Sequence, residues 1–123
     1  MEIFNLTQHA ASPEQIEAGV VDFPADVRRE ISSLLTFEEV PTKLDMVRRA
    51  QALARLAVEC SLHRCDCAMI GGAPFFMAHL EKSLILVGIR PLYAFSRREA
   101  VDGPDGKKLS VFRHAGFVEG IEQ

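Results

Sequence analysis

The segment Ala68-Met69-Ile70-Gly71-Gly72-Ala73-Pro74, at the centre of the chain, most limits what this sequence can fold into. Its apolar first half predicts a buried strand, and Pro74 suits the first turn of a helix because proline has no N–H to lose there. The two glycines allow a close approach of the backbone. Such a strand-to-helix turn directs free N–H groups toward one point, where a phosphate can bind. Alternatively, the glycine pair only permits a tight turn.

The rest of the chain alternates between strand and helix patterns. Short apolar runs predict strands at residues 2–6, 20–23, 67–70, 91–95 and 109–112. Helical spacing, N-caps at Ser12 and Thr42, and stop signals predict helices over residues 13–18, 24–37, 43–60 and 74–87. This alternation predicts an α/β fold over residues 1–123, a single domain with an open, mostly parallel sheet, flanking helices and a C-terminal β-hairpin around the turn 103–106.

Length and composition predict a protein that folds without a structural metal ion or a disulfide bond. A chain of 123 residues with 48% hydrophobic content buries a core without metal or disulfides. Cys60, Cys65 and Cys67 surround His63, but their spacing matches no common zinc site, so we expect a structural or incidental role, no metal and no cofactor. No apolar stretch reaches the roughly 20 residues of a membrane span, and the first residues lack a basic leader, so we expect no membrane and a cytoplasmic location.

Charge is unevenly spread along the chain. The net charge is −3, yet residues 90–114 carry six basic and three acidic side chains, whereas residues 1–66 carry seven basic and eleven acidic ones. An acidic protein with one basic segment favours a small polyanion over a long nucleic acid, whose binding needs many phosphate contacts. A solvated basic hairpin is the alternative.

Polar residues follow three of the predicted parallel strands. Thr7, Gln8 and His9 follow the first strand, Gly71 and Gly72 follow the central one, and residues 96–98 follow the next. Ligands in open α/β sheets bind at the carboxyl ends of the strands. We therefore expect these three clusters to meet at one edge.

Several of these residues form motifs that resemble a known family. The motifs are Leu6-Thr7-Gln8-His9, Pro13-Glu14-Gln15, Ile70-Gly71-Gly72, residues 88–99 (Gly-Ile-Arg-Pro-Leu-Tyr-Ala-Phe-Ser-Arg-Arg-Glu) and Val111-Phe112-Arg113-His114-Ala115-Gly116-Phe117. With them the chain resembles, over nearly its whole length, the small Csx-type CRISPR-associated proteins. Those are single-domain, Rossmann-like or CARF-like α/β proteins of type III CRISPR systems, and several are ring nucleases.

The resemblance implies a ligand and an assembly. The ligand is a cyclic oligoadenylate, most simply the cyclic tetra-adenylate, whose two-fold symmetry suits a homodimer. Cleavage without metal proceeds by attack of a ribose 2′-OH on its own 3′-phosphate, which needs positioning and charge stabilisation. The expected catalytic residues are His9, Arg97, Arg98 and His114. The expected ligand-binding residues are Thr7, Gln8, Gly71, Gly72, Ala73, Ser96, Lys107, Lys108 and Arg113.

Other interpretations of these residues stay open. The arginine pair is alternatively a surface salt bridge to Glu99, His9 orients its loop or binds adenine, and His114 is an ordinary strand residue. At the level of function, the protein alternatively sequesters the ring without cleaving it. A third hypothesis is that the chain is a domain that binds a nucleotide derivative and is unrelated to CRISPR.

Overall fold

The computed structural model describes residues 2–120. Nine elements follow one another along the chain: β1 (Ile3–Leu6), α1 (Pro13–Glu17), β2 (Val20–Val21), α2 (Ala25–Leu35), α3 (Lys43–Cys60), β3 (Cys67–Ile70), α4 (Pro74–Leu86), β4 (Arg90–Asp102) and β5 (Lys108–Glu119). Within residues 2–120, no helix is both long and apolar enough to cross a membrane.

The five strands form one sheet in the order β2-β1-β3-β4-β5. The pairs β1–β2, β1–β3 and β3–β4 are parallel, and β5 pairs antiparallel with β4. The predicted α/β class, the mostly parallel sheet and the C-terminal hairpin are therefore confirmed. Because the chain moves from β1 outward to β2 and then returns across β1 to β3, the direction of strand addition reverses between β1 and β3.

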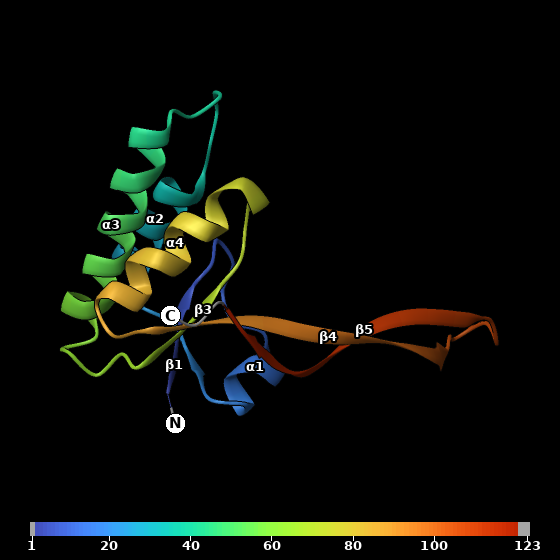
Figure 1. Cartoon of the computed structure of the whole chain (residues 1–123). Helices are drawn as coiled ribbons and strands as arrows, with labels where there is room; N and C mark the ends of the chain where they lie inside the picture. Colours follow the sequence, from blue (N-terminus) through green and yellow to red (C-terminus); the bar gives the residue numbers. More distant parts are fainter. Residues whose placement is uncertain (1, 121–123) are drawn as a thin grey trace.

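Helices cover the two faces of the sheet unequally. Helices α2, α3 and α4 pack on one face, which we call the helix-layer face, and the short α1 lies on the other (Figure 1). Alternate residues of each strand serve the two faces. Phe4, Leu6 and Ile70 join the large core under α2–α4, whereas Ile3 and Met69 join a smaller core on the α1 face.

The local signals in the sequence set the helix ends closely. Ser12 and Gln15 form the predicted capping box, and the Thr42 side chain accepts a hydrogen bond from the Asp45 N–H. Gly88 takes φ +82°, a left-handed conformation that suits glycine, just after α4. Two elements end earlier than predicted: α2 ends at Leu35 instead of residue 37, and β2 ends at Val21 instead of residue 23.

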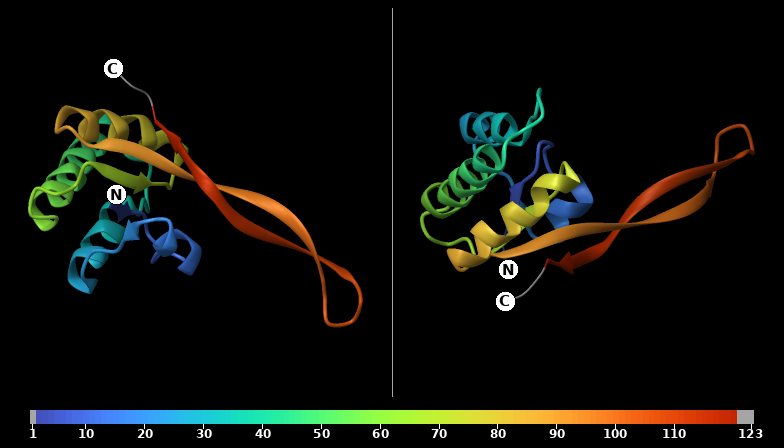
Figure 2. Two further views of the ribbon diagram at one scale, coloured as in Figure 1. Left: turned by 90° about the horizontal axis from the view of Figure 1, so that it is seen from below. Right: turned by 45° about the horizontal axis from the view of Figure 1, so that its top comes forward.

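The hairpin is much longer than predicted. The sequence pattern ends the fourth strand at Phe95, whereas β4 continues to Asp102 and pairs with β5 from Leu92 to Asp102. β3 pairs only with residues 90–93 of β4, so the remainder of the hairpin leaves the body (Figure 1). We call residues 94–117 the arm. Figure 2 shows that the arm stays clear of the helices in two further views and twists strongly.

Candidate functional site

A cleft opens at the carboxyl ends of the three central strands. It has a volume of about 450 Å³. Its lining comes from the loop after β1, from α1, from the end of β3 and the glycine turn after it, and from the part of β4 where the arm begins: Thr7, Gln8, His9, Ala10, Gln15, Met69, Ile70, Gly71, Gly72, Tyr93 and Ala94. Ligand pockets typically span about 300–1,000 Å³. The cleft lies at the point between β1 and β3 where strand addition reverses, which is the usual binding position in open α/β sheets.

A buried asparagine holds the loop after β1. Asn5 Nδ2 donates to the His9 carbonyl (2.8 Å) and to Asp22 Oδ1 (2.7 Å), and Asn5 Oδ1 accepts from the Thr7 N–H (2.9 Å) and hydroxyl (2.7 Å). Asp22 also accepts from the Ala11 N–H. This network ties both ends of the loop to β1 and to the residue after β2, so the backbone that carries His9 into the cleft is well defined.

The glycine turn forms the opposite wall. Gly72 has φ +142°, which L side chains rarely adopt, so the turn requires glycine there. Gly71 has no such requirement, but an added Cβ would lie 3.8 Å from Thr7 Cγ2 and narrow the cleft. Pro74 starts α4, and no side chain caps this helix. Pro74 has no N–H and the Phe76 N–H donates to the Ala73 carbonyl (3.0 Å), so the start of α4 offers the N–H groups of Ala73 and Phe75 and the positive end of the helix dipole near the cleft.

Two further predicted binding residues have structural partners. Gln8 Nε2 donates to Thr36 Oγ1 (2.9 Å), which links the loop to the end of α2. Ala73 packs its side chain against the large core, so it can contribute to the cleft only through its backbone.

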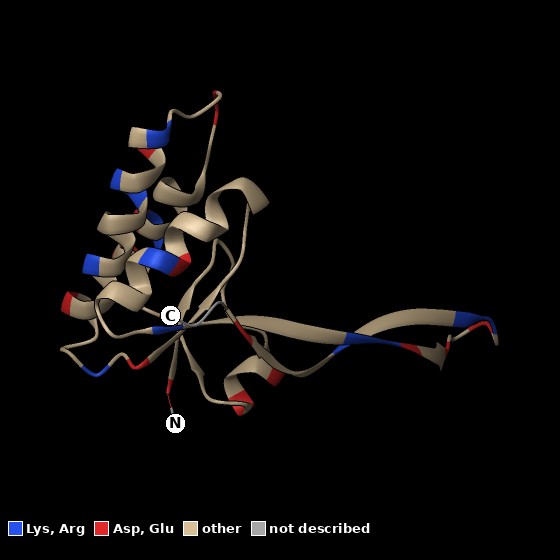
Figure 3. Ribbon diagram, viewed as in Figure 1, with Lys and Arg blue, Asp and Glu red and all other residues tan. Residues whose placement is uncertain are grey.

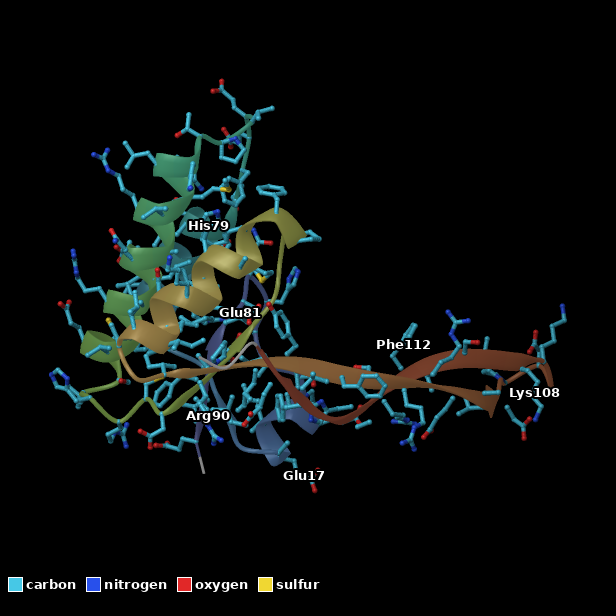
Figure 4. All side chains as sticks on the ribbon, in the orientation of Figure 1. Glu17, His79, Glu81, Arg90, Lys108 and Phe112 are labelled. Atoms are coloured by element: carbon cyan, nitrogen blue, oxygen red, sulfur yellow. The ribbon has the colours of Figure 1, made fainter. Side chains whose placement is uncertain are left out.

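Tyr93 and Glu81 form a pair that the sequence analysis does not identify. The Tyr93 hydroxyl donates to Glu81 Oε2 (2.7 Å), and Glu81 is a buried carboxylate on α4. Burial, together with the hydrogen bond to Glu81 and its charge, raises the pKa of Tyr93. Figure 4 shows Glu81 between α4 and the start of the arm. The pair joins the third wall of the cleft to the helix layer.

The structure places residues 96–98 and the predicted site residues of β5 and the hairpin turn outside this cleft, which corrects the expectation that all three clusters meet at one edge. Residues 96–98 do not follow the end of a strand but lie within β4. Successive side chains of a strand point to opposite faces, so Arg97 and Arg98 cannot both face the cleft. Arg97 shares the helix-layer face with Tyr93 and lies opposite Arg113, whereas Arg98 lies opposite Phe112 on the α1 face.

The other arm residues are distributed in the same way. Ser96 lies opposite His114, and Lys107 and Lys108 stand at the far end of the hairpin. The alternative of a salt bridge from the arginine pair to Glu99 is wrong, because Glu99 pairs with Arg113 (3.7 Å) and the Arg98 guanidinium lies over the Phe112 ring, 5.4 Å from its centroid. None of these residues lines the cleft.

His114 has an unusual environment. Its ring contacts Phe117 edge to face at 4.8 Å, and both ring nitrogens are buried without a hydrogen-bond partner among the described residues. This placement beside the β-bulge of β5 matches the open interpretation of an ordinary strand residue more closely than that of a catalytic group.

The cysteines occupy structural positions. Cys65 and Cys67 are buried, Cys60 ends α3, and burial raises the pKa of the Cys65 thiol to about 12, with Cys67 and Asp66 adding to the shift. Such a thiol stays protonated and unreactive at neutral pH. In the described part of the chain, no three His, Cys, Asp or Glu side chains gather as metal ligands would.

A larger hollow of about 900 Å³ lies between the end of α2 and the start of α3. Its main cation, Arg49, already donates to the carbonyls of Leu34 (3.2 Å) and Thr36 (2.7 Å) and to Asp45 Oδ1 (3.1 Å). These bonds satisfy the free carbonyls at the C-terminus of α2. We therefore regard this hollow as a helix junction and the carboxyl-edge cleft as the candidate site.

Comparison with known proteins identifies a family. A family described as the uncharacterized protein MJ1673 family matches residues 1–118. The chain belongs to the MJ1673 family. The match covers every residue that lines the cleft and the whole arm. The comparisons with curated proteins and with solved structures return no match.

Four residues of the site region were not predicted from the sequence: Asn5, Asp22, Tyr93 and Glu81. A signal for Asn5 is visible in retrospect, since an amide in the middle of the apolar run Ile3–Leu6 needs buried partners. No comparable signal exists for Tyr93 and Glu81, because their pairing depends on the packing of α4 against β4.

Proposed function

We propose that this protein binds a cyclic oligoadenylate, most simply the tetra-adenylate, at the carboxyl-edge cleft and cleaves it without a metal ion. The observation that carries the proposal is the meeting of the loop after β1 with the glycine turn, at the reversal point of the sheet and beside the uncapped start of α4. Backbone N–H groups in that position favour phosphate. The strand order also supports a Rossmann-like, CARF-like classification of this sheet.

A pair of arginines on the arm, three residues beyond the cleft-lining Ala94, supports a polyphosphate ligand. Arg97 and Arg113 lie directly opposite each other on the helix-layer face, and like charges in that relation are unfavourable. Glu99 offsets only Arg113. A phosphate beside the two guanidinium groups relieves the repulsion, and a guanidinium binds phosphate through two parallel hydrogen bonds.

The size of the cleft supports a shared ligand. A volume of about 450 Å³ is small for four nucleotides, so each cleft accommodates part of the ring. We therefore propose a homodimer in which two clefts face each other across a two-fold axis and each contacts half of a two-fold symmetric ring.

The chemistry follows from these positions. A ribose 2′-oxygen attacks the adjacent phosphorus, its proton passes to a base, the bond from phosphorus to the 5′-oxygen breaks, and that oxygen receives a proton. The product is a linear adenylate with a 2′,3′-cyclic phosphate. His9, which lines the cleft and belongs to a residue type that titrates near neutral pH, is the candidate acid or base. Arg97 is the candidate for transition-state charge, and Arg98, on the opposite face, is not.

The test is incubation of the purified protein with labelled cyclic tetra-adenylate in EDTA, followed by chromatography. We expect linear products, a loss of about 100-fold or more in rate for His9→Ala, and about 10- to 100-fold weaker binding for Arg97→Ala. Arg48→Ala, which removes an exposed arginine from α3, is the matched control and leaves both unchanged.

The other outcomes separate the alternatives. Tight binding of a ring that stays intact rejects cleavage and supports sequestration. If the protein binds a mononucleotide but not cyclic tetra-adenylate, the proposal is rejected and a domain that binds a nucleotide derivative is supported.

A further inference from the structure

The outer half of the arm exposes apolar side chains that its own body cannot reach. Phe112 is 64% exposed and Leu109 48%, and Figure 4 shows Phe112 far from every helix. Nine residues of β4, from Ala94 to Asp102, extend about 30 Å at roughly 3.3 Å each. This length is comparable with the diameter of the body, so the tip of the arm lies where only another molecule can touch it.

The arm lacks the contacts that would stabilise it alone. A two-stranded hairpin is marginally stable in water unless another layer covers it. The ion pairs on the arm, Lys108–Asp102 (2.6 Å) and Arg113–Glu99 (3.7 Å), are solvent-exposed and therefore contribute little. A partner that covers the apolar side chains would supply the missing stabilisation.

The body carries a surface that complements the tip of the arm. An apolar groove of about 640 Å³ lies beside the start of α4, between Phe75 and the segment Phe37–Pro41, with Glu38 and Glu39 on its wall. Val40 and Phe75 in this groove are exposed. The tip of the arm carries side chains that complement this groove. Leu109 and Val101 lie opposite each other on one face and are apolar, and Lys107 and Lys108 directly follow the turn and are basic.

The distribution of charge favours a second copy of this chain as the occupant. The arm carries five basic and three acidic side chains, whereas the remainder of the chain carries nine basic and fourteen acidic ones. Figure 3 shows basic residues near the middle and at the tip of the arm. A basic arm and an acidic body on the same chain are complementary between two copies, and a two-fold axis makes the contact twice.

We propose that the tip of the arm seats in the Phe37–Pro41/Phe75 groove of a second copy and brings Lys107 and Lys108 beside that copy's cleft. The groove and the cleft both border the start of α4, because Phe75 lines the first and Gly72 the second. Lys108 exchanges its exposed bond to Asp102 for the glutamates of the groove. Lys107 then adds positive charge to the partner's site, a part of the proposal that depends on the proposed function.

The assembly is tested without any ligand by sedimentation of the full chain. We expect the wild type to be a dimer and both Leu109→Asp and Phe75→Asp to weaken association by about tenfold or more, since each buries an unpaired charge. Leu86→Asp changes an exposed leucine of the body outside the groove, 72% exposed against 48% for Leu109, and leaves the dimer intact. Circular dichroism checks that every variant is folded. The proposal is overturned if the wild type is a monomer, or if the Leu109→Asp and Phe75→Asp variants dimerise as tightly as the wild type.

Two further measurements identify the contact itself. Carbodiimide cross-linking of mixed ¹⁴N- and ¹⁵N-labelled protein should join Lys107 or Lys108 to Glu38 or Glu39 in peptides of mixed isotope; cross-links of a single isotope only would overturn the proposal. Charge reversal of either pair weakens the dimer, and reversal of both in one chain restores it.

The experiments distinguish failure of the proposed arm–groove contact from failure of the proposed function. A dimer with these contacts that does not bind cyclic tetra-adenylate rejects the ligand and leaves the arm contact standing. Cleavage by a monomer rejects the arm contact and leaves the chemistry standing. With both intact, Lys107→Ala/Lys108→Ala retains the fold and weakens ring binding by about tenfold or more.

Discussion

Replacement of Asn5 by alanine tests the link between the core of the sheet and the candidate site. The side chain makes four hydrogen bonds of 2.7–2.9 Å, to the His9 carbonyl, Asp22 and two groups of Thr7. A net contribution of roughly 0.5–1.5 kcal/mol for each gives about 2–6 kcal/mol in total. Because the partners lie in a half-exposed loop where water can replace the amide, we expect the low end, about 2–3 kcal/mol.

The measurement is urea denaturation followed by circular dichroism, with the free energy of unfolding compared at equal slope. Gln8→Ala is the control, since it removes a single exposed hydrogen bond to Thr36 and should cost about 0.5 kcal/mol. The double variant with Asp22→Ala should show a coupling energy of about 1 kcal/mol or more, because both side chains belong to one network. A loss below about 1 kcal/mol for Asn5→Ala would refute the view that this residue holds the loop.

Two other predictions concern stability. The folded protein keeps the Tyr93 proton to a higher pH than the unfolded chain because the pKa of Tyr93 is raised, so the free energy of unfolding should fall as pH rises above about 10. Urea titrations at pH 9 to 11 should show a weaker fall for Tyr93→Phe, and equal curves would contradict the pairing with Glu81. His114→Phe retains the ring contact with Phe117 and removes two unpartnered nitrogens, so its Tm should rise, whereas that of His114→Ala should drop. Differential scanning fluorimetry measures both, and a lower Tm for His114→Phe would show that the imidazole has a partner.

Part of the site was predictable because its signals are local. The glycine turn, Pro74 at the start of α4 and the polar loop after β1 are each recognisable within a few residues, and an α/β alternation places them on the same edge. The prediction that Ser96–Arg98 join that edge was wrong for a physical reason. Where a strand ends depends on its neighbours, and β5 continues to pair with β4 after β3 has stopped.

The sequence by itself determined the helices with their caps, the strand alternation and the short loops around the cleft, because these follow from contacts between residues three or four apart or from the backbone preferences of glycine and proline. Only the tertiary structure decided that Arg97 and Arg98 face opposite ways on a long arm, that Asn5 is bound to Asp22, and that Tyr93 reaches Glu81. These relations join residues distant along the chain or depend on how far one strand follows another. The periodicity of a single segment carries no information about contacts between distant residues or about the length over which two strands pair.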